Sequence, residues 1–159
     1  MEFVNNDGKI PAAEWFEALL PLMDAGYSLK ICPAGVSMVP FLRGGRDEAV
    51  LSVPGEGYVI KKNDIVLYRI ENGAYVLHRV CRVGNGRIYA LGDGNVFIEG
   101  PICRAEIIAV ADYIIRKGRM IRNDCRAYIL LVNIWRLLRP LRPFLIKGYS
   151  IIWRALKNK

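Results

Sequence analysis

The chain has 159 residues, of which 53% are hydrophobic and 24% are charged. This composition excludes intrinsic disorder and fits one folded domain, with or without an appendage. The formal net charge of +8 is unevenly distributed: residues 1–115 hold 11 basic and 14 acidic residues, whereas residues 116–159 hold 12 basic residues and one acidic residue. The positive charge therefore belongs to the C-terminal part, which predicts a surface partner for that part.

Cysteine and histidine usage argues against a metal site or a disulfide framework. The four cysteines form no CxxC pair, and the chain has a single histidine, so we expect no metal and no other cofactor. The segment 1–10 carries acids and asparagines, unlike a secretory signal, and no window reaches the ~18 apolar residues of a membrane span. We expect a cytoplasmic protein, either free or held peripherally at a membrane.

Three segments are predicted: 1–27, 28–122 and 123–159. In the first, apolar residues recur at helical spacing between Pro11 and Asp24, with a kink expected at Pro21 and an end at Gly26. We expect this helix to pack on the body. Its acidic residues argue against the alternative, an anchor on a membrane surface.

The middle segment, 28–122, predicts a mainly β domain with a partly rolled antiparallel sheet. Short runs rich in branched and aromatic residues alternate with glycine and proline turns, as in other small all-β domains. The expected strands are Ser28–Cys32, Ala49–Val53, Asp64–Ile70, Ala74–Val83, Arg87–Leu91, Glu106–Arg116 and Arg119–Arg122.

The basic tail predicts two helices, Tyr128–Arg139 and Phe144–Leu156, separated by Pro140 and Pro143. Its basic residues are interleaved with large apolar ones, which is atypical of a nucleic-acid groove, so no nucleic-acid partner is expected. Two interpretations stay open: a helical hairpin packed on the body, or a surface that binds an anionic membrane.

The stretch from Pro33 to Pro40 places Ser37 among turn-forming residues. Such a bend exposes a hydroxyl in a fixed direction, as a nucleophilic serine requires. The alternative is a serine that only satisfies backbone groups in a turn.

The single histidine provides a candidate base. Alternation along the strand puts Val76, His78 and Val80 on one face, where partial desolvation favours the neutral imidazole. The alternative is a buried histidine bonded to a backbone carbonyl. Asp93, in a glycine-flanked turn, is the candidate acid, and an ordinary turn aspartate is the alternative. Asp64 competes with it but fits a turn better.

These motifs, in the order Gly-x-Ser-Met-x-Pro, Asp-Ile-Val-Leu-Tyr-Arg, Val-Leu-His-Arg-Val and Leu-Gly-Asp-Gly-Asn, resemble the signal peptidase I family. They also resemble the related self-cleaving domain of SOS-response repressors. The similarity runs from about Ser28 to Ile115. The resemblance implies Ser37 as the nucleophile and Asp93 as the acid. It also implies His78 as the base, as in the Ser-His branch of the family; members outside that branch carry a lysine at this place.

Several positions depart from the family pattern. Gly35 stands where many signal peptidases have a serine that binds the oxyanion, so backbone amides of Val36, Ser37 and Met38 would have to do so. Gly94 is inserted before Asn95, and the second downstream aspartate of some relatives has no counterpart between Ile98 and Cys103. The residues expected to contact substrate are Gly35, Val39, Pro40 and Val76.

We therefore predict a serine endopeptidase that removes a leader, signal or pro-peptide through an acyl-enzyme, binding its substrate as an extended strand. The nearest lysines, Lys61 and Lys62, precede the base strand. The main alternative is a non-catalytic peptide-binding module on the same fold. A self-cleaving regulator is disfavoured because no DNA-binding domain precedes Ser37.

Overall fold

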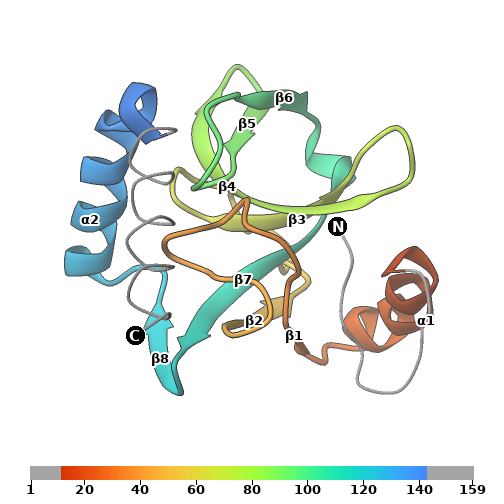
Figure 1. Ribbon diagram of the computed structural model, residues 1–159. Coiled ribbons are helices and arrows are strands. Elements are labelled where there is room, and N and C mark those ends of the chain that lie inside the picture. Colours follow the sequence, from red (N-terminus) through yellow and green to blue (C-terminus); the bar gives the residue numbers. More distant parts are fainter. Residues whose placement is uncertain (1–11, 143–159) are drawn as a thin grey trace.

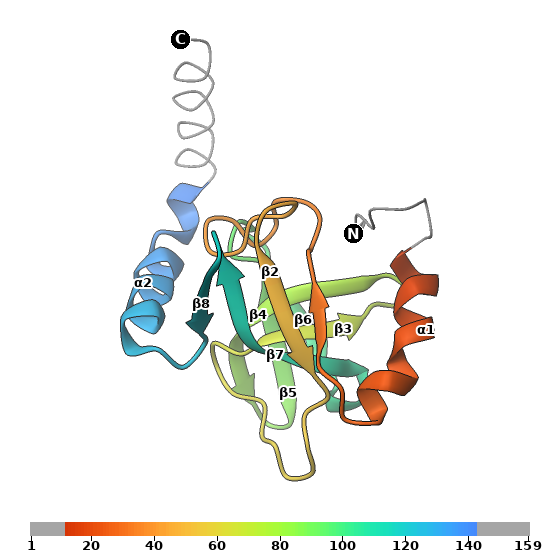
Figure 2. The ribbon, with the colours of Figure 1, turned by 90° about the horizontal axis from the view of Figure 1, so that it is seen from below.

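The computed structural model describes residues 12–142 and is mainly β, as predicted (Figure 1). An antiparallel, unclosed sheet forms the body, and two helices lie at opposite sides of it (Figures 1 and 2). The elements are α1 (Ala12–Asp24), β1 (Leu29–Ile31), β2 (Glu48–Ser52), β3 (Ile65–Arg69), β4 (Tyr75–Gly84), β5 (Arg87–Leu91), β6 (Glu99–Ile102), η1 (Arg104–Glu106), β7 (Ile107–Arg116), β8 (Arg119–Arg122), α2 (Arg126–Leu137) and η2 (Arg139–Leu141).

The strand order is β1-β2-β7-β3-β4-β5-β6, with β8 paired to β7. All seven expected strands are present, with ends that differ from the prediction by at most one residue. The sequence did not predict β6, which contains Gly100 and Pro101, two residues of low strand propensity. Pairing with β5, at Ile88–Ile102 and Ala90–Glu99, defines this strand.

Side chains from the central strands are buried on both faces of the sheet. On one face, Leu67 and Leu77 join a core that also contains residues of α1 and α2. On the other face, Val66, Tyr68 and Val80 join residues of β5, β6 and β7 in a second core. A sheet that encloses its own second core is rolled, which confirms the partly rolled architecture.

Helix α1 packs on the body, as expected. Phe16 and Met23 are buried in the first core, and the ring centroid of Phe16 lies 4.9 Å from that of Tyr75 on β4. Pro21 lies inside the helix, and Gly26, at φ +91°, follows its end. The helix is therefore part of the core rather than an appendage.

Helix α2 corresponds to the first predicted tail helix and also packs on the body, through Tyr128 and Val132. The second predicted helix, Phe144–Leu156, lies outside the described residues. Within residues 12–142, no helix is both long and apolar enough to cross a membrane.

We predict that Phe16→Ala lowers the free energy of unfolding by about 3–5 kcal/mol, because it leaves a cavity between α1 and the sheet. Urea unfolding followed by circular dichroism measures the change. The matched control is Leu22→Ala on the same helix, at a side chain that is 52% exposed, where a change within about 0.5 kcal/mol is expected. Equal effects of the two substitutions would contradict the docking of α1.

Candidate active site

Ser37 and His78 line the same open cleft, of about 1000 Å³. Ser37 comes from the loop between β1 and β2 and is half-buried, whereas His78 lies on β4 and is buried. The start of β6, with Glu99, provides a further wall. Among residues 12–142 no group hydrogen-bonds the Ser37 hydroxyl. In serine enzymes the hydrogen bond between the hydroxyl and its base often forms fully only when substrate is bound. The fold thus places a hydroxyl and an imidazole that lie far apart in sequence on the walls of one cleft.

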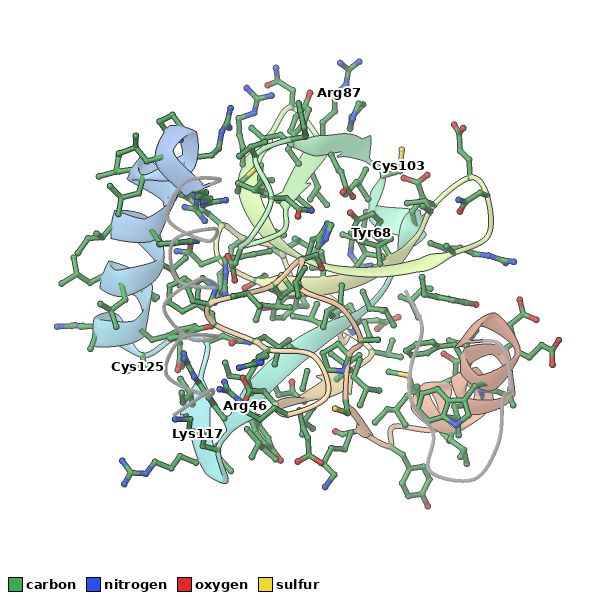
Figure 3. All side chains as sticks on the ribbon, viewed as in Figure 1. Arg46, Tyr68, Arg87, Cys103, Lys117 and Cys125 are labelled. Carbon is green, nitrogen blue, oxygen red and sulfur yellow. The ribbon has the colours of Figure 1, made fainter. Side chains whose placement is uncertain are left out.

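The Nδ1 atom of His78 faces Glu99 and Tyr68. It lies 3.2 Å from Oε2 of Glu99 and 3.3 Å from the Tyr68 hydroxyl oxygen, and Tyr68 donates its hydroxyl proton to Glu99. Figure 3 shows the Tyr68 side chain in the interior, between the β3–β4 pair and β6. Tyr68 donates its single hydroxyl proton to Glu99 and has none to donate to His78. We therefore assign the imidazole hydrogen to Nδ1, which faces the Glu99 carboxylate. The other ring nitrogen, Nε2, is then left as a proton acceptor.

The charges of this cluster suit a base. The hydrogen bond from His78 is the main cause that lowers the pKa of Glu99; partial burial opposes it, and the hydrogen bond from Tyr68 adds to it. Burial, together with the neighbouring Glu99 carboxylate, raises the pKa of Tyr68. Glu99 is therefore ionised at neutral pH and can stabilise an imidazolium at His78.

Asp93 is not the partner of His78, which corrects the prediction from sequence. Its carboxylate accepts hydrogen bonds from Nε of Arg79, at 3.0 and 3.1 Å, and from Nη2, at 2.8 Å. The same Nη2 donates to the Tyr128 hydroxyl at 2.7 Å. Arg79 follows His78 on β4, so their side chains point to opposite faces of the sheet. Asp93 belongs to the face covered by α2.

The turn that contains Asp93 nevertheless supports the Ser37 loop. The Gly94 amide donates to the Ser37 carbonyl oxygen at 2.7 Å. A Cβ atom at Gly92 would lie 2.6 Å from that same oxygen, and one at Gly94 would lie 2.7 Å from the Val36 carbonyl oxygen. On the far side, the Trp135 indole donates to the Asp93 carbonyl at 2.5 Å. The turn that contains Asp93 is thus placed to position the Ser37 loop through backbone contacts.

The backbone of the Ser37 loop offers donors. Within the described part of the chain, the amides of Val36, Ser37 and Met38 donate to no protein acceptor. Val36 and Ser37 line the cleft, so their amides are available to an oxyanion, whereas Met38 is not among the lining residues. The Met38 side chain, 3% exposed, anchors the loop in the first core. Gly35, at φ +85°, provides the left-handed conformation that begins the bend.

The remaining candidates divide between the cleft and other places. Gly35 and Val76 line the cleft, as expected of substrate contacts. Val39 and Pro40 are not among its lining residues, and the Val39 amide closes the turn onto the Val36 carbonyl at 3.1 Å. Their predicted contact with substrate is therefore not supported by the geometry.

The competing base and acid candidates lie elsewhere. Lys61 and Lys62 line a separate cavity of about 740 Å³ and do not reach the cleft. Asp64 accepts hydrogen bonds from the Lys61 amide at 2.9 Å and from the Tyr58 hydroxyl at 3.1 Å. It acts as a turn residue, as the sequence indicated.

Sequence reasoning missed Glu99 and Tyr68. Tyr68 shares the face of His78 because β3 pairs with β4 through Val66 opposite His78, a relation that alternation along both strands could have revealed. Glu99 lies inside the interval from Ile98 to Cys103, where the family pattern predicts an aspartate. A glutamate is the carboxylate that this interval contains.

Known protein families, curated proteins and solved structures include none that matches this chain. The chemical assignments therefore depend on the residues and their geometry. Across residues 12–142, no three histidine, cysteine or acidic side chains come together to hold a metal ion.

We predict that Asp93→Ala lowers the free energy of unfolding by about 3–5 kcal/mol, because it leaves the buried Arg79 guanidinium without its counter-charge. Glu99→Gln should cost far less, since the Glu99 side chain is 39% exposed. Urea unfolding of both variants measures the difference, with Asp112→Ala as an exposed aspartate control. Similar small losses in all three would contradict the structural role of Asp93.

A second prediction concerns the inserted glycine. Gly94→Ala must push away the Val36 carbonyl, next to Ser37 in the chain. Labelling of Ser37 by a fluorophosphonate should therefore slow by about tenfold or more, as expected for a misplacement of the reacting atom by about 1 Å. Gly55→Ala is the control, because a Cβ there meets no atom within 4 Å. Equal labelling rates would show that the turn does not position Ser37.

Proposed function

We propose that the protein is a serine endopeptidase of the signal peptidase-like, Ser-His type, which removes a leader, signal or pro-peptide. One observation carries the proposal: Ser37 and His78 share an open cleft, and Glu99 holds Nδ1 of His78 so that Nε2 is free to accept a proton.

The proposed reaction is acyl transfer. Ser37 Oγ attacks the peptide carbonyl while Nε2 of His78 takes the hydroxyl proton, and Glu99 stabilises the resulting imidazolium. Amides of the Ser37 loop stabilise the oxyanion. His78 then gives its proton to the leaving amine, and a water, deprotonated by the same nitrogen, hydrolyses the acyl-enzyme and releases Ser37.

The shape of the cleft supports an extended peptide as substrate. In the described sheet, β6 is the last strand in the order, and its residues line the cleft. An outer strand edge presents backbone groups that a peptide can pair with as an added strand. Ile70, Val76 and Ile102 give the cleft apolar walls for its side chains.

Covalent labelling tests this function against the alternative of a non-catalytic peptide-binding module. We predict that a fluorophosphonate labels the wild type at Ser37, that Ser37→Ala is not labelled, and that His78→Ala is labelled at least 10³-fold more slowly. Ser28→Ala, at an exposed serine, should behave as wild type. A folded wild type that resists labelling while still binding peptides would favour the binding module.

Cleavage rates of single variants test the roles of His78 and Glu99. The lowered pKa of Glu99 keeps its carboxylate charged at neutral pH, where it can stabilise an imidazolium at His78. Glu99→Gln removes this charge, so the maximum rate of peptide cleavage should fall by about 10²–10⁴. Activity retained in His78→Gln and lost in Lys61→Met or Lys62→Met would assign the base to a lysine.

A further inference from the structure

Helix α2 carries an apolar stripe that the body leaves exposed. Tyr128, Val132 and Trp135, spaced by four and three residues, face the sheet. On the opposite side, exposed aliphatic residues recur at the same spacing and continue into η2. They are Leu130 (61% exposed), Leu131 (57%), Ile134 (47%), Leu137 (80%) and Leu141 (51%). A contiguous exposed stripe of this kind is typical of an interaction surface.

The surroundings of this stripe are positively charged. Residues 116–142 contain eight basic residues, of which one, Arg142, is buried, and one acidic residue. That acid, Asp124, is paired with Arg122 at 2.8 Å. The following 17 residues, 143–159, contribute four more basic residues and no acid. An aliphatic helix face within a cationic region complements an anionic lipid surface, where each basic residue adds roughly 1 kcal/mol of attraction.

We infer that the outer face of α2 docks on an anionic membrane surface, with the helix lying in the plane of the interface. At 12 residues the helix is about 18 Å long, short of the ~30 Å hydrocarbon core, so it cannot span. The two interpretations of the tail then apply to different faces of one helix: the inner face packs on the body, and the outer face binds lipid.

This docking does not depend on the proposed peptidase activity, but it bears on where that activity acts. The inner face of α2 contacts the Asp93 turn through Trp135, and that turn holds the Ser37 loop. Lipid bound to the outer face would therefore hold the cleft at a fixed distance from the membrane surface.

Vesicle co-sedimentation of the full chain tests the inference. We expect binding to vesicles of phosphatidylcholine with phosphatidylglycerol, and at least tenfold weaker binding to phosphatidylcholine alone. Leu130→Gln/Leu137→Gln should reduce the partition coefficient for anionic vesicles by about tenfold or more, from the loss of two leucine side chains from the apolar phase. The matched control, Leu22→Gln/Val59→Gln, removes two exposed aliphatic residues elsewhere and should bind as wild type.

Three outcomes would overturn the inference. Unchanged binding of the Leu130→Gln/Leu137→Gln variant would assign lipid binding to residues outside α2, and no binding of the wild type would exclude a lipid partner. A wild type that is dimeric by light scattering, with a monomeric Leu130→Gln/Leu137→Gln variant, would identify the face as a protein interface. Labelling of Ser37 in the absence of vesicles reports separately on the proposed function.

Discussion

The buried pair of Arg79 and Asp93 is the interaction on which the rest of the structure depends. It joins three parts of the chain: β4, the turn after β5, and α2 through the Tyr128 hydroxyl. Burial disfavours the charge of Arg79, but Asp93 and Tyr128 together raise its pKa above the ordinary value. A pair satisfied by this many hydrogen bonds offsets the desolvation of both charges, and losing either partner would leave the other uncompensated. The Ser37 loop packs on the turn that contains Asp93, so its position depends on this pair.

Much of the fold could be predicted from local sequence pattern. Alternating branched residues and glycine turns indicated seven strands, and the same alternation placed His78 on a defined face. Strand β6 was not predicted because Gly100 and Pro101 have low strand propensity, and the position of Glu99 on this strand was therefore not predicted either. The neighbours of Glu99 are determined by the pairing of β5 with β6 and by the roll of the sheet, which are non-local properties.

The misassignment of Asp93 has a related physical cause. Its glycine-flanked turn lies close to Ser37, as a catalytic acid would, and the sequence gives no sign that its side chain points to the other side of the sheet. The residue that decides the matter is Arg79, whose burial at 1% exposure requires a carboxylate nearby. A buried arginine adjacent to a candidate base is thus as informative as the base itself.

The adjacency of His78 and Arg79 limits how this protein can vary. On β4, His78 faces the cleft and Arg79, the next residue, faces the opposite side of the sheet, where it pairs with Asp93. Deleting or inserting one residue between the β3–β4 turn and His78 would move the guanidinium to the face of the cleft and the imidazole to the face covered by α2. A change in the length of β4 before His78 would therefore disrupt the cleft and the buried ion pair together.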